Sequence, residues 1–326
     1  MGHQTSLLIE FVAAFIVSLV TTYIIVPRLV PRLKSRGITG KDLNKPNKPQ
    51  VAEMGGIATI IGFFAGVSVV LALDSVMDQH LVGQPLINVS LTAVLGAGFV
   101  GVIDDIFDLR QRYKAILPFM LALPLGAVVS PEIVIPYIAK VDFGGFMIIA
   151  AAFAMTCAAN AANMLEGFNG LGTGLGIIMA LTLIILGVVH DRLDGVYLLT
   201  PLVGALIAFL WFNKYPAEVF PGDTMTLFMG AALAAAGLLS MLHVQTVFIF
   251  IPLIVEFFLK ARGRFRAENY STNEKDGHLE YQGKIESLTH VFMKYTRCTE
   301  VTLVYKIWAL EAVFCSVVVV VDLLLN

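Results

Sequence analysis

The sequence predicts an all-α polytopic membrane protein that forms a single domain over residues 1–326. Of these residues, 57% are hydrophobic and only 14% are charged. Soluble domains carry about 25% charged residues, so this chain has too few to cover a water-exposed globule. The formal net charge of −2 provides no basic excess for a nucleic-acid partner. The three cysteines are too few and too widely spaced for a disulfide framework or a zinc site.

Ten apolar stretches supply the expected helices, because a spanning helix needs about 20 mostly apolar residues. The first stretch lacks a basic N-terminal flank and is followed by basic residues, which is typical of a retained anchor and not of a cleaved signal peptide. Prolines interrupt the region of the fourth and fifth stretches. In chain order the stretches are 6–26, 54–73, 87–103, 115–130, 143–159, 171–190, 195–212, 224–240, 243–259 and 302–325.

Lysine and arginine are concentrated in one set of loops. All but three of the 22 Lys and Arg residues lie in five loops, 27–53, 104–114, 160–170, 213–223 and 260–301. Basic residues mark cytoplasmic loops, so we expect these five loops in the cytoplasm and both termini outside. The longest loop, 260–301, is too short for a separate domain, and its polar tract 267–282 is expected to form a short hairpin or loop. The same five loops hold nearly every unusual polar group.

The loop after the third stretch contains three aspartates, Asp104, Asp105 and Asp108, followed by Lys114. A continuous helix would place Asp104 and Asp108 on one face, one turn apart. Carboxylates this close repel one another and need a cation or basic partners to remain ionised together. A divalent metal that also binds phosphate meets this need, and Lys114 is suited to bind an anionic oxygen. The alternative interpretation is a solvated helix end with Asp–Arg pairs.

Three asparagines follow the fifth stretch, in the segment NAANMLEGFNGLGTG. Asn160 and Asn163 lie one helical turn apart, so both amides can face one cavity. An asparagine oxygen can bind Mg²⁺, and an asparagine amide can hydrogen-bond to a nucleobase. Gly167 and the glycines after Asn169 let a ligand approach the backbone closely, although close helix packing explains glycines equally well.

Two further loops carry groups suited to an anionic ligand. In FPGDT, Asp223 stands at the start of the eighth stretch, where it is either an N-cap or a carboxylate free to bind metal. Phe220 in the same segment is placed to stack on a planar ligand. Arg262 and Arg264 follow the ninth stretch and would point the same way in an extended segment. They fit a guanidinium clamp on phosphate or a plain cytoplasmic anchor.

The proline-rich basic segment DLNKPNKPQVAE precedes the second stretch and contains Lys45 and Glu53. Glu53 is either an N-terminal charge complement of the next helix or a substrate contact. Together the five loops offer carboxylates, amides and cations, but no nucleophilic triad, no P-loop lysine and no dinucleotide fingerprint. This inventory fits a metal-held diphosphate beside a lipid-accessible groove.

Two other functions remain open from the residues alone. Asp104-Asp105-x-x-Asp108 spells an aspartate-rich diphosphate motif, which suggests an intramembrane prenyltransferase, although the sequence holds no second motif of this kind. A transporter is the other alternative, and it predicts carboxylates at mid-membrane depth.

The segments DDIFDLRQRYK, NAANMLEGFNGL and FPGDT resemble, in content and order, the three core motifs of the polyprenyl-phosphate N-acetylhexosamine-1-phosphate transferases. The resemblance runs from about Asp42 to Arg266 and is closest to the dolichyl-phosphate branch of archaea and eukaryotes. It implies a ten-helix fold with a cytoplasmic active site, in an archaeal plasma membrane or a eukaryotic endoplasmic reticulum. It also implies transfer of a sugar-1-phosphate, with N-acetylglucosamine the expected sugar, from a UDP-sugar to a polyprenyl phosphate of dolichyl type, with release of UMP.

The resemblance also implies roles for individual residues. Asp104 and Asp105 match the essential aspartate pair, expected to be catalytic. Asn163 and Asp223 match the metal ligands, for Mg²⁺ with Mn²⁺ as an alternative. Together with the loop patterns, it gives as substrate-binding residues Lys45, Glu53, Asp108, Lys114, Asn160, Gly167, Asn169, Phe220, Arg262 and Arg264. Of these, Lys114, Arg262 and Arg264 match family positions near the diphosphate. Gly167, Asn169 and Phe220 match family positions in the uridine pocket. The expected partners are the UDP-sugar, the lipid phosphate and the bilayer, with a homodimer left open.

Overall fold

The computed structural model describes residues 3–45, 47–77, 84–135, 138–271, 273–275 and 277–325. These residues form helices, three two-stranded antiparallel hairpins and the 3₁₀ turn η1 (Gly144–Phe146). The helices are α1 (His3–Ser35), α2 (Gly56–Met77), α3 (Gln84–Phe107), α4 (Gln111–Val128), α5 (Met147–Met164), α6 (Leu171–Val189), α7 (Val196–Asn213), α8 (Gly222–Leu239), α9 (His243–Ile249), α10 (Ile251–Arg262), α11 (Leu288–Tyr295) and α12 (Glu300–Leu325). The hairpins pair β1 (Thr39–Lys41) with β2 (Gln50–Ala52), β3 (Glu132–Ile135) with β4 (Ala139–Asp142), and β5 (Asn273–Lys275) with β6 (His278–Glu280).

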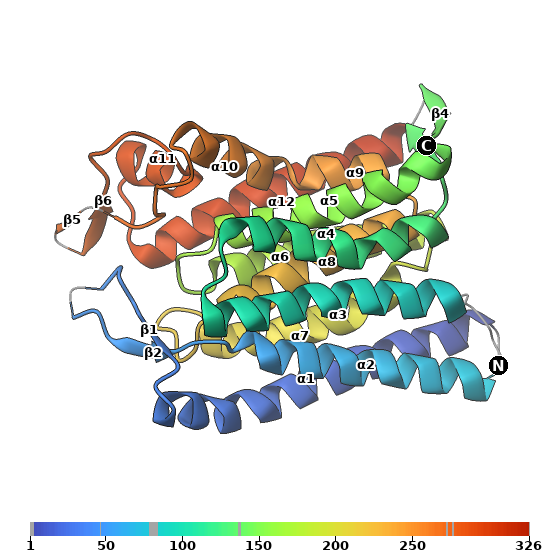
Figure 1. Ribbon diagram of the computed structural model, residues 1–326, viewed down its shortest axis with the longest axis horizontal. Helices are drawn as coiled ribbons and strands as arrows, with labels where there is room; N and C mark the ends of the chain where they lie inside the picture. The colour runs from blue at the N-terminus through green and yellow to red at the C-terminus, as the bar shows by residue number, and fades with distance from the viewer. Residues whose placement is uncertain are drawn as a thin grey trace.

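The long helices run side by side along the long axis of the molecule (Figure 1). Because chain direction alternates, the α3–α4, α5–α6 and α7–α8 connections gather at one end, together with the β1–β2 and β5–β6 hairpins and α11. We call this the loop end. α1 begins and α12 ends at the opposite end, which also holds β4 (Figure 1). The hairpin expected in the tract 267–282 is therefore confirmed as β5–β6, and the predicted basic loops share one end of the bundle.

The chain is an all-α polytopic membrane protein, but the predicted count of ten spans is not confirmed. Helices lie at all ten predicted positions. Among the described residues, eight helices are long and apolar enough to cross a membrane, and α9 with α10, which meet at a bend of 57°, would add a ninth if the pair forms one span. α4 falls short because its first turn carries Arg112 and Lys114 and its interior contains Pro118 and Pro124. α4 still runs from the loop end to the opposite end against α3 and α5, as the alternation of the chain requires (Figure 1).

The first helix is longer than the predicted stretch 6–26, because α1 continues to Ser35 with Pro27 and Pro31 inside it. Each proline removes one backbone hydrogen bond but holds a φ that a helix accepts. At a rise of 1.5 Å per residue, its 33 residues span about 50 Å, which exceeds the roughly 30 Å of a hydrocarbon layer. The basic last turns of α1 are therefore expected to extend beyond the apolar layer at the loop end.

α8 is the most enclosed helix, because all its residues from Thr224 to Leu239 are buried. It packs against α3 and α5, with further contacts to α2, α6 and α7. Glycines allow the closest approaches: a Cβ on Gly101 of α3 would lie 2.6 Å from Thr224 Cα, and one on Gly230 of α8 would lie 2.7 Å from Ala159 Cα of α5. The ends of α3, α5 and α8 are thus held together at the loop end.

Gly101→Ala should lower the thermal midpoint of the purified protein in detergent. The new methyl group meets backbone atoms of α8, which cannot rotate away, and overpacking of this kind costs about 1–3 kcal/mol. Gly145→Ala is the matched control, since a Cβ there meets nothing within 4 Å. Equal midpoints for the two variants would contradict the tight α3–α8 contact.

Candidate functional site

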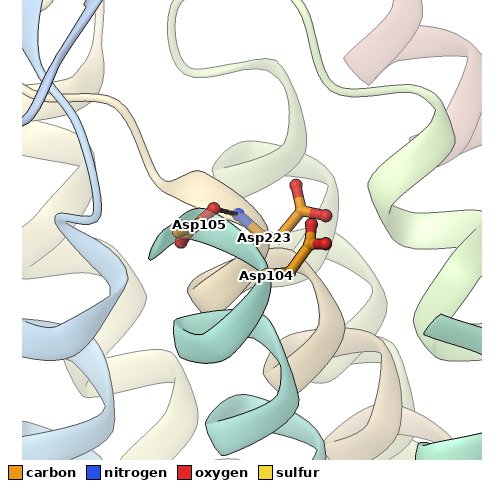
Figure 2. A group of neighbouring side chains, drawn as sticks. All are labelled: Asp104, Asp105 and Asp223. Carbon is orange, nitrogen blue, oxygen red and sulfur yellow. Dashed lines mark hydrogen bonds between the residues drawn. The ribbon is translucent and has the colours of Figure 1, made fainter. Parts of the chain in front are cut away.

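Three carboxylates from two distant segments meet at the loop end. Asp104 and Asp105 lie in the last turn of α3, and Asp223 lies in the first turn of α8. One carboxylate oxygen of each lies within 4.8 Å of the others. Figure 2 shows the carboxylates of Asp104 and Asp223 side by side, whereas the carboxylate of Asp105 turns to the other side. We call these three residues the acidic cluster.

Lys114 provides the positive charge that the acidic cluster requires. Its ammonium group, in the first turn of α4, forms an ion pair with Asp104 and a second with Asp223 at 2.8 Å. The Lys114 side chain is 12% exposed, so solvent screens these pairs less than it would at an open surface. The sequence predicts that Lys114 binds an anionic oxygen. In the structure the anionic oxygens that it binds belong to the carboxylates of Asp104 and Asp223.

Asp105 performs a different task from Asp104. Its Oδ1 accepts a hydrogen bond from the Asp223 backbone N–H at 2.8 Å, and its Oδ2 accepts from the Thr224 N–H at 3.0 Å and the Thr224 hydroxyl at 2.6 Å. The first N–H groups of a helix have no partner within the helix. Asp105 therefore caps α8 from a neighbouring helix and fixes the backbone that carries Asp223. The catalytic role expected for both aspartates stays a prediction. Of the two, Asp104 has its carboxylate beside that of Asp223, whereas the carboxylate of Asp105 binds the backbone of α8 (Figure 2).

Asn163 joins the cluster from the end of α5. Its Nδ2 donates to Asp223 Oδ2 at 2.9 Å, and its Oδ1 accepts from the Thr226 hydroxyl at 3.1 Å. Asn160, one turn earlier, donates to the carbonyls of Thr156 at 2.9 Å and Lys114 at 3.4 Å. The two amides thus have separate tasks: Asn163 contacts the acidic cluster, and Asn160 ties α5 to the start of α4.

The acidic cluster fits a Mg²⁺ ion by the chemistry of its donors. Mg²⁺ prefers hard oxygen ligands such as carboxylate and amide oxygens. One carboxylate oxygen of Asp223 lies within 4.8 Å of an oxygen of Asp104 and of Asp105, and Asn163 Oδ1 keeps a second lone pair after accepting from Thr226. The carboxylates of the cluster leave an excess of negative charge over the single positive charge of Lys114. A divalent cation would remove this excess.

A second set of charged groups surrounds Asn169, on the loop between α5 and α6. Asn169 Nδ2 donates to Asp42 at 3.2 Å, and the Asn169 backbone N–H donates to Glu300 at 3.2 Å. Lys45 pairs with Asp42 and, at 3.4 Å, with Glu300, and its ammonium lies 4.6 Å from the centre of the Tyr215 ring. We call Asp42, Lys45, Asn169 and Glu300 the charged network. Lys45, predicted as a substrate-binding residue, thus has protein carboxylates as its partners.

The α5–α6 loop is held at its centre by two more asparagines. Asn44 Nδ2 donates to the Gly167 carbonyl at 2.8 Å. Asn269, beyond α10, donates to the carbonyls of Met164 at 3.0 Å and Glu166 at 2.6 Å. The segment after α10 therefore lies directly on the loop that carries Asn163 and Asn169 at its ends.

The α7–α8 loop is fixed to the β1–β2 hairpin. The Phe220 N–H donates to the Ala52 carbonyl at 2.7 Å, and the Phe220 carbonyl accepts from the Gly55 N–H at 2.9 Å. Glu53 lies between these contacts, and burial, with Asp105 and Asp223 nearby, raises the pKa of its carboxyl. Glu53 is therefore close to the acidic cluster, and Phe220 stands three residues before Asp223. The substrate contacts expected of both stay predictions.

Three predicted residues lie apart from the acidic cluster. α3 ends at Phe107, and Asp108 is exposed with a left-handed φ of +49°. The predicted common helical face for Asp104 and Asp108 is therefore wrong. Arg262 is the last residue of α10, and Arg264 has a φ of +56°, so the extended segment expected for this pair is also wrong. Both arginines are exposed and are free to reorient toward an anion.

Sequence reasoning missed several residues that build the site. Glu300 lies just before the last apolar stretch, where the sequence gives no sign of a binding role. Asn269 lies in a polar tract without periodicity. Asp42 and Glu166 lie within the segments DLNKPNKPQVAE and NAANMLEGFNGLGTG described above. An acidic side chain within a proline- or glycine-rich loop is the feature that could have marked each as part of the site.

Known proteins resemble this chain along nearly all of its length. A model of the family described as Glycosyl transferase family 4 matches residues 87–241, from α3 to α8. A relative from Saccharolobus solfataricus, provisionally named UDP-N-acetylglucosamine–dolichyl-phosphate N-acetylglucosaminephosphotransferase, is 36% identical over 97% of this chain and 97% of its own length. The Schizosaccharomyces pombe protein of that name is 28% identical over 79% of this chain and 68% of its own length. A phospho-N-acetylmuramoyl-pentapeptide-transferase from Desulforudis audaxviator is 30% identical over 70% of this chain and 74% of its own length.

Asp105→Ala should destabilise the protein, because it removes three hydrogen bonds at the start of α8. Loss of a helix cap costs about 1–2 kcal/mol, which should appear as a lower thermal midpoint in detergent. Glu218→Ala, which also removes an acidic side chain but at an exposed position without a left-handed φ, should leave the midpoint unchanged. The capping role of Asp105 is wrong if both variants melt like the parent.

Glu166→Gln should weaken the dependence of stability on pH near neutrality. Burial raises the pKa of Glu166 from 4.5 to about 7, against the lowering effect of the Gly172 and Gly167 N–H groups. Because the folded state binds the proton more tightly, the stability that Glu166 contributes is fully present below about pH 4.5. It is lost as pH rises through about 7. The difference in thermal midpoint between pH 5 and pH 8 should therefore shrink in E166Q and persist in the exposed control Glu218→Gln.

Proposed function

Because the chain belongs to glycosyl transferase family 4, we propose that it transfers N-acetylglucosamine-1-phosphate from UDP-N-acetylglucosamine to a polyprenyl phosphate of dolichyl type, releasing UMP. The observation that carries this proposal is the meeting of Asp104, Asn163 and Asp223 with Lys114 at one end of the bundle. These groups come from four helix ends, those of α3, α4, α5 and α8. The similarity to relatives named for this reaction, one of them matched over 97% of both chains, supports the same assignment.

The proposed topology places the loop end in the cytoplasm and both chain termini outside. The concentration of lysine and arginine at this end supports that orientation. The membrane is a plasma membrane if the source is archaeal and the endoplasmic reticulum if it is eukaryotic. A UDP-sugar would then reach the site from the cytoplasm, and the lipid phosphate would reach it laterally from the bilayer.

We assign Asp223 and Asn163 as the residues that would hold Mg²⁺, or Mn²⁺ in its place. When bound, the ion would neutralise charge on the phosphates of the nucleotide sugar. Asp105 contributes by fixing the first turn of α8, and so the position of Asp223. Thr226 orients the amide of Asn163 by donating to its oxygen.

The remaining chemistry requires positioning more than proton transfer. An oxygen of the lipid phosphate attacks the phosphorus that carries the sugar. A new P–O bond forms as the bond from this phosphorus to the UMP oxygen breaks, and UMP leaves with the bonding electron pair. A phosphate monoester is mostly ionised at neutral pH, so no strong base is needed. Lys114 would therefore bind an anionic oxygen of the substrates, and Asp104 would position the Lys114 ammonium through their ion pair.

The structure gives less support to the two other functions. The motif Asp104-Asp105-x-x-Asp108 does not form a common ligand face, because Asp108 leaves the helix. Glu256, a buried carboxylate that a transporter would use, accepts hydrogen bonds from the Ser287 hydroxyl and the Leu288 N–H and so caps α11. Both observations are consistent with the transferase.

The purified protein should release UMP from UDP-N-acetylglucosamine when polyprenyl phosphate and Mg²⁺ are both present. Chelation with EDTA should abolish release, and added Mg²⁺ should restore it. Asp223→Ala should reduce turnover by at least about 100-fold, the scale expected for loss of a group that organises charge in the transition state, without loss of folded protein. Asp191→Asn, an exposed change at the opposite end, is the matched control.

Release of UMP from another UDP-sugar, but not from UDP-N-acetylglucosamine, would support the proposed reaction class and overturn the proposed sugar. No release with any UDP-sugar, together with solute flux in reconstituted vesicles, would favour a transporter.

A further inference from the structure

The charged network determines which atom of Asn169 can meet a ligand. Asn169 is 6% exposed. Its side-chain nitrogen donates to Asp42, and its backbone N–H donates to Glu300. Within the described part of the chain, no residue donates a hydrogen bond to Asn169 Oδ1. The amide is therefore anchored through its nitrogen, and its oxygen is the acceptor left for a ligand.

This orientation follows from chemistry and not only from the atomic positions. An ionised carboxylate accepts hydrogen bonds and cannot donate them, so Asp42 must face the amide nitrogen. Lys45 lies between Asp42 and Glu300 and pairs with both, so each of these carboxylates accepts from Lys45 as well as from Asn169. The side chains of Asp42 and Glu300 are only 3% and 5% exposed. Water therefore competes little for their oxygens.

The position of Asn169 suits contact with the base of a bound nucleotide. Asn169 follows Asn163 by six residues, and six residues span at most about 20 Å. Glu53 lies near two aspartates of the acidic cluster. Glu53 and Asp42 both lie near Tyr270, where burial and these charges raise the pKa of its hydroxyl. The charged network is therefore close to the acidic cluster, and a nucleotide whose phosphates lie at that cluster has its base within reach of Asn169. The Tyr270 ring lies against Gly167, since a Cβ on that glycine would be 3.5 Å from the ring, so the loop also offers an aromatic surface.

We propose that Asp42 is a positioning residue that sets base specificity, because it holds the oxygen of the Asn169 amide toward the nucleotide. An oxygen there accepts a hydrogen bond from a ring N–H. Uracil carries such an N–H at N3, whereas N3 of cytosine is an acceptor and would face the amide oxygen without a proton between them. The inference rests on the proposed function and adds the physical origin of its preference for a uridine nucleotide.

The expected discrimination is substantial. A buried acceptor left unpaired costs about 1–3 kcal/mol, which corresponds to roughly 5- to 150-fold in affinity. Wild-type protein should therefore bind UMP roughly 5- to 150-fold more tightly than CMP or N3-methyl-UMP. 5-Methyl-UMP retains the N3 proton and should bind like UMP, provided its methyl group is accommodated.

The test is the ratio of CMP to UMP dissociation constants, measured by calorimetry on the full-length protein in detergent. In Asp42→Asn the new amide can donate or accept, so the Asn169 amide can rotate and the ratio should fall toward one. Asp42→Glu keeps a group that only accepts and should retain discrimination. Glu300→Gln should weaken both nucleotides by a similar factor, since it supports the Asn169 backbone and not the amide orientation. Asp191→Asn is the matched acid-to-amide control.

A wild-type protein that binds CMP as tightly as UMP, or a D42N protein that keeps the wild-type ratio, would overturn the inference. If D42N does not fold, Asp42→Ser replaces it, since a hydroxyl also donates and accepts. Failure of the proposed function gives a different result: no UMP binding and no UMP release by the wild-type protein.

Discussion

The loop end is organised around mutual repulsion among the carboxylates of Asp104, Asp105 and Asp223, which lie within 4.8 Å of one another. Three separate devices offset this repulsion. Lys114 pairs with two of the carboxylates, the N-terminal amides of α8 bind the third, and Asn163 donates to Asp223. Each device comes from a different helix end, so the cluster exists only when α3, α4, α5 and α8 are all in register.

Much of this site could be predicted from the sequence, because its principal residues lie in short polar segments at the ends of apolar stretches. The bias of basic residues placed those segments on one side, and alternating helices then bring them together. The sequence could not show that Asp108 leaves the helix or that Arg264 adopts a left-handed φ. Such local reversals depend on tertiary contacts around a helix end and leave no periodic signal.

The span count shows a similar limit. Apolar length identified ten helices, but it could not show that α4 keeps a polar first turn, where Lys114 is needed at the acidic cluster. A segment that contributes a charged group to the site is less apolar for that reason. The helix that fits the membrane least well by composition is thus one that the site requires.

The α5–α6 loop connects the two polar assemblies of the protein. Its first end is fixed at Asp223 through Asn163, and its second end is fixed by Asp42 and Glu300 through Asn169. Glu300 is also the first residue of the last helix. During synthesis, the acidic cluster can assemble before α12 has entered the bilayer, whereas Asn169 gains its full set of anchors only afterwards. Insertion of the final helix is therefore the step that completes the surroundings of Asn169, and a product that stops short of it retains the acidic cluster beside an incompletely anchored loop.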